Sequence, residues 1–388
     1  MMKKNIAILG STGSIGQTTF DILKKDKNFF DIRLLTTNES TNILLKQAKI
    51  FNVKNLIITN HEKYISFKKI HKKKYKIYNN FECLDKIFKN KKIDYVMSSI
   101  SGFNGLDPTL KIIKFTSTIA IANKEAIICG WNLIDKELKK YGSKFIPVDS
   151  EHFSIWSLIK NKKIRNIEKI YITASGGPFA KLPLNKFKSI LPKDALKHPN
   201  WTMGKKISID SATMMNKVFE IIEAKKIFNL QYKDIEILIH PKSYIHAIIK
   251  FKNGLTKILL HDTTMTIPIF NSLFENSNKV IKTKEIDLSI LNDLQLTKVD
   301  ARRYPIIDVL RKLPNNDSIF EILVVHVNDK LVDLFLKKKI KFNQISSKLL
   351  KIIECQEFKK YKHIKVNNIR EVKDIINYLS LKIDYLSV

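Results

Sequence analysis

A glycine-rich turn near the start of the chain is the feature that most constrains its fold. Gly10-Ser11-Thr12-Gly13-Ser14-Ile15-Gly16 directly follows a short apolar strand at residues 5–9 and opens a helix at residues 15–25. Glycines at such a junction permit a tight turn and let main-chain N–H groups at the helix N-terminus approach a pyrophosphate. The spacing is G-x-x-G-x-x-G, not the usual G-x-G-x-x-G. The turn therefore predicts a dinucleotide site, with a merely tight strand–helix junction as the alternative.

Strands and helices alternate through the first part of the chain. A helix is expected at residues 41–50, and further strands at residues 32–36, 55–59, 95–99 and 118–122. Such alternation is typical of a doubly wound parallel sheet with helices on its faces. We therefore assign residues 1–150 to an α/β dinucleotide-binding domain.

The turn after the second strand bears on the choice of cofactor. Thr36-Thr37-Asn38-Glu39-Ser40 contains one acid and neither Arg nor Lys. An acid here accepts a hydrogen bond from a ribose 2′-OH and repels a 2′-phosphate, which favours NAD. The local pattern alone leaves the choice between NAD and NADP open.

The rest of the chain divides into three predicted parts. Residues 151–275 mix Gly- and Pro-rich loops with strands and a helix from about Ala212 to Phe228, which indicates an α+β catalytic domain. Its strands are expected at residues 169–173, 235–239 and 246–251. Residues 276–300 are polar with little periodicity and are predicted to be a linker. Residues 301–388 are Lys-rich and helical in pattern, which predicts a C-terminal helical domain with helices at residues 317–338 and 342–354.

Three acids suggest a metal site. Asp149 and Glu151 follow a strand-like segment, and carboxylates at i and i+2 can point the same way from an extended chain. Glu220 stands one helical turn after Lys217. Three converging carboxylates suit a hard cation such as Mg²⁺ or Mn²⁺ and leave positions for a substrate, whereas three unrelated surface acids are the alternative. With Asn216 and Lys217 beside them, the acids predict metal-assisted chemistry on a phosphorylated small molecule.

The formal net charge of +32 raises the question of a nucleic-acid partner. Only six of the 69 basic residues are Arg, the better residue for bidentate contacts to phosphates and bases. Lys is spread along the whole chain together with much Ile and Asn, the composition that an AT-rich genome imposes. A solvated basic face is therefore favoured over a nucleic-acid surface, and no nucleic-acid partner is expected.

The chain carries no pattern of a membrane or secreted protein. No segment approaches the ~18 consecutive apolar residues of a membrane span, so no membrane partner is expected. Met1-Met2-Lys3-Lys4 leads straight into the first strand without the longer apolar core of a signal peptide, which predicts a cytoplasmic protein. Cys83, Cys129 and Cys355 are odd in number and far apart, which argues against a disulfide framework or a zinc site.

Six motifs stand in the order found in one enzyme family. They lie at residues 10–16, 122–125, 147–152, 174–179, 198–204 and 210–217. Together they resemble 1-deoxy-D-xylulose 5-phosphate reductoisomerases over roughly residues 4 to 260. The resemblance implies a Rossmann-like sheet, a homodimer, and a metal-dependent rearrangement of 1-deoxy-D-xylulose 5-phosphate. The product of that rearrangement is reduced by NADPH to 2-C-methyl-D-erythritol 4-phosphate, in the non-mevalonate route to isoprenoids.

The resemblance also implies roles for individual residues. Those that match metal ligands are Asp149, Glu151 and Glu220. The same three acids, with Lys124 and His198, match the catalytic set. Residues that match substrate contacts are Lys124, Ser150, Glu151, Ser175, His198, Trp201, Ser211, Asn216, Lys217 and Glu220. Residues that match cofactor contacts are Thr12, Gly13, Ser14, Ile15, Asn38, Asn123, Glu125 and Gly204.

Within that set, four residues match a phosphate site and one matches a lid. Ser175, Ser211, Asn216 and Lys217 combine two hydroxyls, an amide and a point charge, a reasonable set for a dianion. Ser211 is also expected to cap a helix that starts at residue 212. Trp201 stands in a loop, residues 198–204, that resembles the mobile lid of the family.

The chain departs from the family pattern at three places. Asn38-Glu39-Ser40 replaces a Gly-Lys-Asn-like turn, which predicts a weaker preference for NADPH. Residues 260–268 keep only Met265 and Pro268 of a stretch near the subunit contact, which predicts a weaker dimer. The C-terminal part lacks a Leu-Asn-Ala-Ala-Asn-Glu run, and Asn328-Asp329 is the nearest remnant.

Three other functions stay open from sequence. A different nucleotide-dependent dehydrogenase would need no divalent cation, which the trio of acids argues against. A basic nucleic-acid-binding protein that carries a dinucleotide-binding domain would bind nucleic acid with a steep salt dependence. A catalytically inactive remnant is the third, although every residue assigned to the metal and the phosphate is present.

Overall fold

The computed structural model describes residues 3–387 except 90, 161–163, 202 and 276, and the chain forms two compact units. The first unit comprises Met1–Ala126, Leu133–Phe153 and Met265–Lys282. The second comprises Ile127–Asn132, Ser154–Thr264 and Thr283–Val388. The predicted division at residues 150, 275 and 300 stays a prediction, and Asn276, the first residue of the predicted linker, lies outside the described residues.

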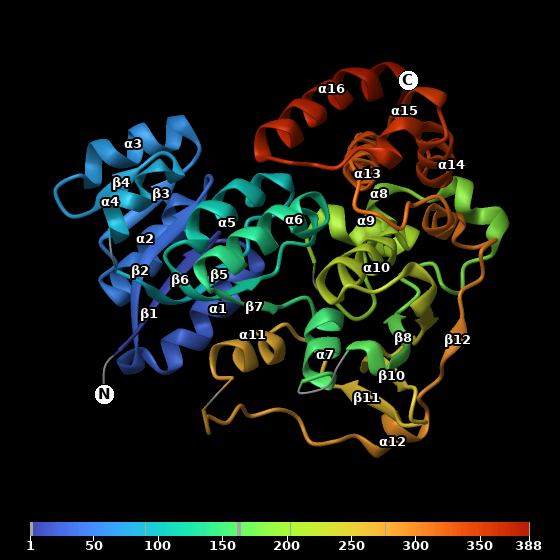
Figure 1. The fold of residues 1–388 in the computed structure, drawn as a ribbon, viewed down its shortest axis with the longest axis horizontal. Helices are drawn as coiled ribbons and strands as arrows, with labels where there is room; N and C mark the ends of the chain where they lie inside the picture. The colour runs from blue at the N-terminus through green and yellow to red at the C-terminus, as the bar shows by residue number, and fades with distance from the viewer. Residues whose placement is uncertain (1–2, 90, 161–163, 202, 276, 388) are drawn as a thin grey trace. The chain divides into compact units, whose positions relative to one another are not determined.

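A seven-stranded parallel sheet forms the centre of the first unit (Figure 1, blue to teal). Its strands are β1 (Lys4–Leu9), β2 (Phe30–Thr37), β3 (Asn55–Ile58), β4 (Lys76–Tyr78), β5 (Ile93–Ser98), β6 (Thr116–Ile121) and β7 (Lys144–Pro147). They lie in the order β4-β3-β2-β1-β5-β6-β7, and every neighbouring pair is parallel. The predicted doubly wound sheet is confirmed. The strand order reverses between β1 and β5, which is where ligands bind at the carboxyl ends of such sheets.

The helices of the first unit are α1 (Ser14–Lys25), α2 (Thr41–Phe51), α3 (His61–His71), α4 (Leu84–Phe88), α5 (Leu106–Ile113), most of α6 (Lys124–Tyr141), and α11 (Thr266–Leu273). A further helix, α7 (Ser150–Leu158), begins in the first unit and belongs to the second from Ser154 onward. Ile8 of β1 and Leu23 of α1 are fully buried in a core that also contains Ile269 and Leu273 of α11. Because α11 shares this core, residues 265–282 fold with the first unit, although they are far from it in sequence.

A five-stranded mixed sheet lies in the second unit, and the helix α10 (Met215–Phe228) packs against its strands β8 and β9. The strands are β8 (Ile167–Ala174), β9 (Ile235–Ile239), β10 (Ile245–Phe251), β11 (Thr256–Leu260) and β12 (Thr297–Lys298). Their order is β11-β10-β8-β9-β12, with β8 and β9 parallel and the other pairs antiparallel. The three strands predicted from sequence are present. The segment predicted as a linker contributes β12 to this sheet.

The helices of the second unit are α8 (Pro192–Ala195), α9 (Lys205–Thr213), α10 (Met215–Phe228), α12 (Leu288–Asn292), α13 (Phe320–Leu336), α14 (Phe342–Ile353), α15 (Gln356–Lys359) and α16 (Ile369–Ser387). Short 3₁₀ helices in the two units span Lys27–Phe29, Phe81–Cys83, Phe103–Gly105, Ile164–Asn166, Leu184–Ser189, Tyr232–Asp234, Pro305–Arg311 and Lys360–His363. The two C-terminal helices predicted around residues 317–338 and 342–354 are α13 and α14.

The predicted single helix from Ala212 to Phe228 is wrong at its start. Met214 adopts a left-handed conformation with φ of 75°, which ends α9 and begins α10. Ser211 therefore lies in the last turn of α9, and the expected N-cap role of Ser211 is wrong. No glycine, proline or polar cluster marks this break, so the sequence pattern continues through it.

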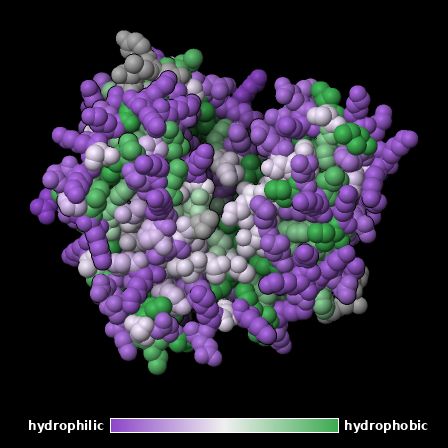
Figure 2. Space-filling view, turned by 180° about the vertical axis from the view of Figure 1, so that it is seen from behind, coloured by the Kyte–Doolittle hydropathy of each residue, from purple (hydrophilic) through white to green (hydrophobic). Residues whose placement is uncertain are grey.

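Hydrophilic side chains predominate on the face seen in Figure 2, with hydrophobic ones in scattered groups. Among the lysines, Lys139 pairs with Asp135 and Lys337 with Asp333 one turn away on the same helix. Within the described part of the chain, no helix is long and apolar enough to cross a membrane. Each of the three cysteines is a thiol that forms no disulfide, as expected.

Candidate functional site

The glycine-rich turn brings the ends of β1 and β2 together. Gly10 has φ of +79°, and a Cβ on it would lie 2.9 Å from the Ser99 carbonyl oxygen. A Cβ on Gly16 would lie 2.2 Å from the Gly10 carbonyl oxygen, so neither position accepts a side chain. Thr12 Oγ1 lies 2.7 Å from Thr37 Oγ1 of β2. The turn is thus held by close main-chain packing against Ser99 and by the contact between Thr12 and β2.

The predicted cofactor residues of this turn stand at the start of α1. Gly13 is the N-cap residue and its N–H donates to the Gly10 carbonyl at 3.1 Å, while Ser14 and Ile15 form the first turn of the helix. The first N–H groups of a helix have no partner within it, and the helix dipole favours an anion there. The local geometry is therefore suited to a pyrophosphate.

Asn38 and Glu39 follow β2. Asn38 Oδ1 accepts a hydrogen bond of 2.9 Å from Thr59 Oγ1, which ties the ends of β2 and β3 together. Glu39 is exposed, and its carboxylate lies 3.4 Å from the amide nitrogens of Asn38 and Asn60. A negative charge thus stands at the end of β2, where a ribose is read in such sheets.

Asn123 joins the ends of β5 and β6. Its Oδ1 accepts from the Ala126 N–H at 3.0 Å and so caps α6, in which Glu125 occupies the first turn. Its Nδ2 donates to the carbonyl oxygens of Gly102, at 2.7 Å, and Ile100. Asn123 therefore fixes the loop after β5 next to the start of α6.

Asp149 and Glu151 lie at the junction of β7 and α7. Asp149 directly precedes α7, and its main-chain carbonyl accepts the first helical hydrogen bond from the Phe153 N–H. The predicted extended conformation is therefore wrong, because the chain turns into a helix right after Asp149. The two carboxylates nevertheless come together, with one oxygen of each within 4.8 Å of the other. Glu151 is buried in the first turn of α7, and Ser150 Oγ donates to its Oε2 at 2.6 Å.

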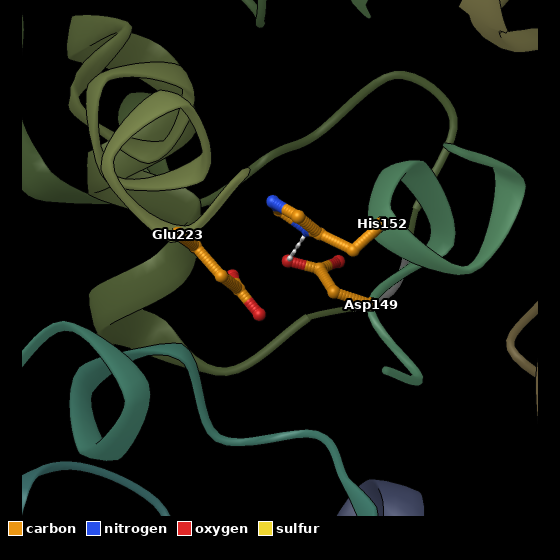
Figure 3. A group of neighbouring side chains, drawn as sticks. All are labelled: Asp149, His152 and Glu223. Atoms are coloured by element: carbon orange, nitrogen blue, oxygen red, sulfur yellow. Dashed lines mark ion pairs between the residues drawn. The ribbon is translucent and has the colours of Figure 1, made fainter. Parts of the chain in front are cut away.

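A lysine and a histidine surround Asp149. Lys124 Nζ, from the first residue of α6, lies 2.8 Å from Asp149 Oδ2, and the lysine is buried. The ring of His152 is fully buried, and its Nδ1 lies 3.8 Å from the same oxygen, as the dashed line in Figure 3 marks. Figure 3 also draws Glu223, which projects from α10 one turn after Glu220 and is buried.

Glu220 is a buried carboxylate on α10, only 1% exposed. Lys217 Nζ lies 2.7 Å from its Oε2, and Asn216 Nδ2 donates to its Oε1. A carboxylate this far from water must be paired and hydrogen-bonded, and both partners stand within the first turn of the same helix. Asn216 and Lys217, predicted as phosphate contacts, thus both bond Glu220, the predicted metal ligand.

His198 and Ser175 form a hydrogen-bonded pair in the second unit. His198 Nδ1 accepts from the Asn200 and Trp201 N–H groups at 3.2 and 3.0 Å, which leaves the ring proton on Nε2. That nitrogen lies 3.2 Å from Ser175 Oγ and therefore donates to it. Burial of the ring and the charge of Lys217 lower the pKa of His198 from 6.5 to about 4, so this tautomer is neutral at pH 7.

The Ser175 hydroxyl is directed by its two donors. The Gly177 N–H donates to Ser175 Oγ at 3.0 Å, in addition to His198 Nε2. A serine hydroxyl accepts two hydrogen bonds and donates one. With both acceptor positions used, its own hydrogen remains to donate to a ligand oxygen.

The main chain of Ser211 packs against the turn formed by residues 175–177. A Cβ on Gly177 would lie 3.0 Å from the Ser211 carbonyl oxygen, so the main chain of the turn packs directly on the last turn of α9. Met214 then reverses the chain into α10, whose first turn carries Asn216 and Lys217. The structure thus brings Ser175, Ser211, and the N-terminus of α10 into one region of the second unit.

The predicted lid segment begins at His198. Trp201 is half-buried, and its ring packs edge-on against the ring of His246 with centroids 6.3 Å apart. Gly204 is the exposed N-cap residue of α9. Thr202, within this segment, lies outside the described residues.

The sequence did not predict a polar cluster that joins α9 to α13. Asn328 of α13 is fully buried, and its Nδ2 donates to Asp210 Oδ1 at 2.7 Å. Lys206 Nζ lies 3.1 Å from Asp210 Oδ2 and 2.9 Å from Asp329 Oδ1. The remnant Asn328-Asp329 noted in the sequence is thus what holds the helix that carries Ser211.

The donor chemistry of the three acids fits a divalent cation. Asp149, Glu151 and Glu220 offer only carboxylate oxygens, the ligands preferred by Mg²⁺ and Mn²⁺. Glu151 and Glu220 are buried, and each of the three is held by a neighbouring donor: Lys124, Ser150 or Lys217. Partners of this kind orient ligating carboxylates in metal sites.

Three family models match the chain. They are "1-deoxy-D-xylulose 5-phosphate reductoisomerase" over residues 6–130, the C-terminal domain of the same enzyme over residues 145–228, and "DXP reductoisomerase C-terminal domain" over residues 260–378. A Pelagibacter ubique 1-deoxy-D-xylulose 5-phosphate reductoisomerase is 62% identical over 387 residues, which cover 99% of this chain and 100% of the relative. The enzyme of Phocaeicola vulgatus is 36% identical and covers 88% of this chain and 89% of its own length.

Solved structures of the same enzyme match the fold over nearly the whole chain. The reductoisomerase from Zymomonas mobilis in complex with NADPH superposes with a TM-score of 0.88 at 28% identity, covering 99% of each chain. A reductoisomerase in complex with NADPH, fosmidomycin and magnesium superposes with a TM-score of 0.86 at 28% identity, again over 99% of each chain.

We predict that His198 stays neutral, with its proton on Nε2, well below pH 6. Because the pKa in the folded protein is about 4 and the ordinary value is 6.5, the unfolded chain takes up the proton first. His198 therefore contributes to a loss of stability as the pH falls from 6.5 to 4. Proton–nitrogen correlation spectra of the imidazoles at pH 5.5, assigned with His198→Gln, test this. A protonated ring or a proton on Nδ1 would contradict it.

Proposed function

The chain belongs to the 1-deoxy-D-xylulose 5-phosphate reductoisomerase family, and we propose how its own residues carry out the reaction of that family. The enzyme rearranges 1-deoxy-D-xylulose 5-phosphate and reduces the product with NADPH to 2-C-methyl-D-erythritol 4-phosphate, a precursor of isoprenoids in the non-mevalonate pathway. The observation that carries the proposal for the residues is the gathering of Ser175, Ser211, Asn216 and Lys217 around the start of α10.

The phosphate of the substrate binds to these four residues. Ser175 donates the hydroxyl hydrogen that its two other hydrogen bonds leave over. Lys217 bonds Glu220 through its ammonium group, whose positive charge also attracts the phosphate. The N-terminus of α10 adds the partial positive charge of its dipole, which favours a dianion.

Asp149, Glu151 and Glu220 would hold Mg²⁺ or Mn²⁺. When bound, the cation supplies Lewis-acid chemistry, polarising the carbonyl of the substrate and lowering the pKa of the adjacent hydroxyl. Lys124 and Ser150 orient Asp149 and Glu151 through the contacts that the structure records, and both also contact the substrate. Lys217 and Asn216 orient Glu220 in the same way.

His198 and Trp201 close the substrate site. The neutral ring of His198 joins the main chain of residues 200 and 201 to Ser175, so the lid and the phosphate residues are held by one side chain. Trp201 excludes water, which strengthens the hydrogen bonds of the bound phosphate. Gly204, the last residue of the lid, is exposed and leaves its main chain accessible to the nicotinamide.

NADPH binds at the carboxyl end of the seven-stranded sheet. Thr12, Gly13, Ser14 and Ile15 present their main chain to the pyrophosphate at the start of α1. Asn38 stands at the end of β2 on the ribose side, and Asn123 and Glu125 contact the cofactor from the start of α6.

The enzyme is a homodimer of the cytoplasm. β11 is the end strand of the second sheet, and Ile258 in it is 47% exposed, so its outer edge is available to another chain. Light scattering should give twice the 45.1 kDa mass of one chain, and Ile258→Lys should shift the mass towards one chain. A single-chain mass for the unmodified protein would contradict the dimer.

The three thiols suit a reducing compartment, which cell fractionation tests.

Glu220→Gln tests the metal residues. With 1-deoxy-D-xylulose 5-phosphate, the enzyme should oxidise NADPH, followed at 340 nm, only when Mg²⁺ or Mn²⁺ is present. The variant should lose more than about 100-fold in turnover and bind Mn²⁺ more weakly, because a neutral amide replaces a ligating carboxylate. Its affinity for NADPH should stay unchanged.

Glu321→Gln is the matched control for that variant. Glu321 is also a fully buried carboxylate of the second unit, close to the ammonium of Lys226, and has no role in the site. Turnover by Glu321→Gln should stay metal-dependent. Turnover retained by Glu220→Gln would remove Glu220 from the ligand set.

Glu39→Lys tests the cofactor preference. The exposed carboxylate at the end of β2 repels a 2′-phosphate, and a lysine there attracts it. The ratio of kcat/KM with NADPH to that with NADH should rise about tenfold, roughly the effect of 1.4 kcal/mol. Glu62→Lys, the same charge change at an exposed position of α3, should leave the ratio unchanged. An unmoved ratio in Glu39→Lys would show that Glu39 does not face the 2′ position.

A further inference from the structure

The turn Ser175-Gly176-Gly177 has a conformation that its own residues do not secure. Gly176 and Gly177 have φ of +85° and +66°, values that other residues rarely adopt. Two successive glycines have many accessible conformations, and the peptide group between them can rotate at little cost. Another part of the chain must therefore hold this turn in one conformation.

Tyr304 holds the peptide group between the two glycines. Its hydroxyl donates to the Gly176 carbonyl at 2.7 Å, and Tyr304 is only 3% exposed. Burial raises the pKa of that hydroxyl to about 12, so it stays protonated and donates. The N–H of the same peptide group belongs to Gly177 and donates to Ser175 Oγ at 3.0 Å. One peptide group is thus fixed by Tyr304 on one side and directs Ser175 on the other.

Arg303, the residue before Tyr304, holds the chain that follows the turn. Its Nη1 donates to the carbonyl oxygens of Phe179 and Leu182, at 2.8 and 2.7 Å. Two neighbouring side chains therefore bind three main-chain carbonyls between residues 176 and 182. Both stand just before the 3₁₀ helix Pro305–Arg311, more than a hundred residues along the chain from the turn.

We propose that Tyr304, assisted by Arg303, is a positioning residue for the phosphate of the substrate. The proposal rests on the phosphate site described above and extends it to residues that contact no ligand. If the peptide group between Gly176 and Gly177 rotates, its N–H turns away from Ser175 Oγ. The serine hydroxyl then loses one of the two hydrogen bonds that direct its hydrogen to the phosphate. The Tyr304 hydroxyl prevents that rotation.

Tyr304→Phe tests the proposal, because it removes the hydroxyl and keeps the ring. The KM for 1-deoxy-D-xylulose 5-phosphate should rise on the order of tenfold, the effect of losing about one hydrogen bond to a charged group. The inhibition constant of inorganic phosphate, as a competitor of the substrate, should rise in parallel. The dissociation constant of NADPH should stay unchanged, since the dinucleotide residues lie elsewhere.

Tyr95→Phe is the matched control. Tyr95 is fully buried in the first unit, and its hydroxyl lies 2.7 Å from Ser272 Oγ, so the variant removes a comparable buried hydrogen bond. It should lower the melting temperature but leave the KM and the inhibition by phosphate unchanged. Arg303→Lys is a second variant of the turn, which keeps the charge but loses the planar donor group, and it should raise the KM in the same direction by less.

The possible outcomes separate this inference from the function itself. If Tyr304→Phe loses stability as Tyr95→Phe does, while KM and phosphate inhibition stay unchanged, Tyr304 is merely structural and the inference is wrong. If NADPH binding weakens equally, the effect is not specific to the phosphate and the inference is also wrong. Failure of the unmodified enzyme to oxidise NADPH with the substrate would overturn the proposed function instead.

Discussion

The left-handed Met214 is the constraint on which the second unit depends. Its φ of 75° is rare for a residue with a side chain and costs of order 1–3 kcal/mol. Packing in the surrounding core compensates for this strain, since the exposed fractions of Met214 and Met215 are 1% and 0%. This break ends α9 just after Ser211 and starts α10 just before Asn216 and Lys217. A continuous helix would place these side chains at the angles of a single helical wheel, pointing in different directions.

The buried charges follow from the same break. Glu220 lies one turn into α10, out of contact with water; Lys217 on its own helix neutralises its charge, and Asn216 donates a hydrogen bond to it. Both partners come from the first turn of the helix that carries the acid, so the start of α10 itself orients the carboxylate. In the first unit the corresponding pair joins two helices, because Lys124 begins α6 and Asp149 precedes α7.

Features that depend on residues adjacent in sequence were predicted correctly, whereas contacts between residues far apart in sequence were missed. The parallel sheet, the glycine turn and the two C-terminal helices have local patterns, and the structure contains them. The extended form of Asp149 and Glu151 was wrong because an acid after a strand also suits the position before a helix. The break at Met214 has no local signal. The contacts of Asn328 with Asp210 and of Tyr304 with Gly176 join residues 118 and 128 positions apart, which no periodicity reveals.

The C-terminal part shows why such contacts matter. Its sequence departs from the run that the family carries around residues 324–332, yet Asn328 and Asp329 are the side chains that reach α9 through Asp210 and Lys206. Most other buried positions of α13, such as Leu323 and Val327, are apolar, and apolar side chains can replace one another when their volumes are kept. A buried amide that bonds a buried carboxylate has no such substitute, because its loss leaves a charge without a partner. In α13, the polar contacts to α9 therefore restrict residue replacement more than the apolar packing does.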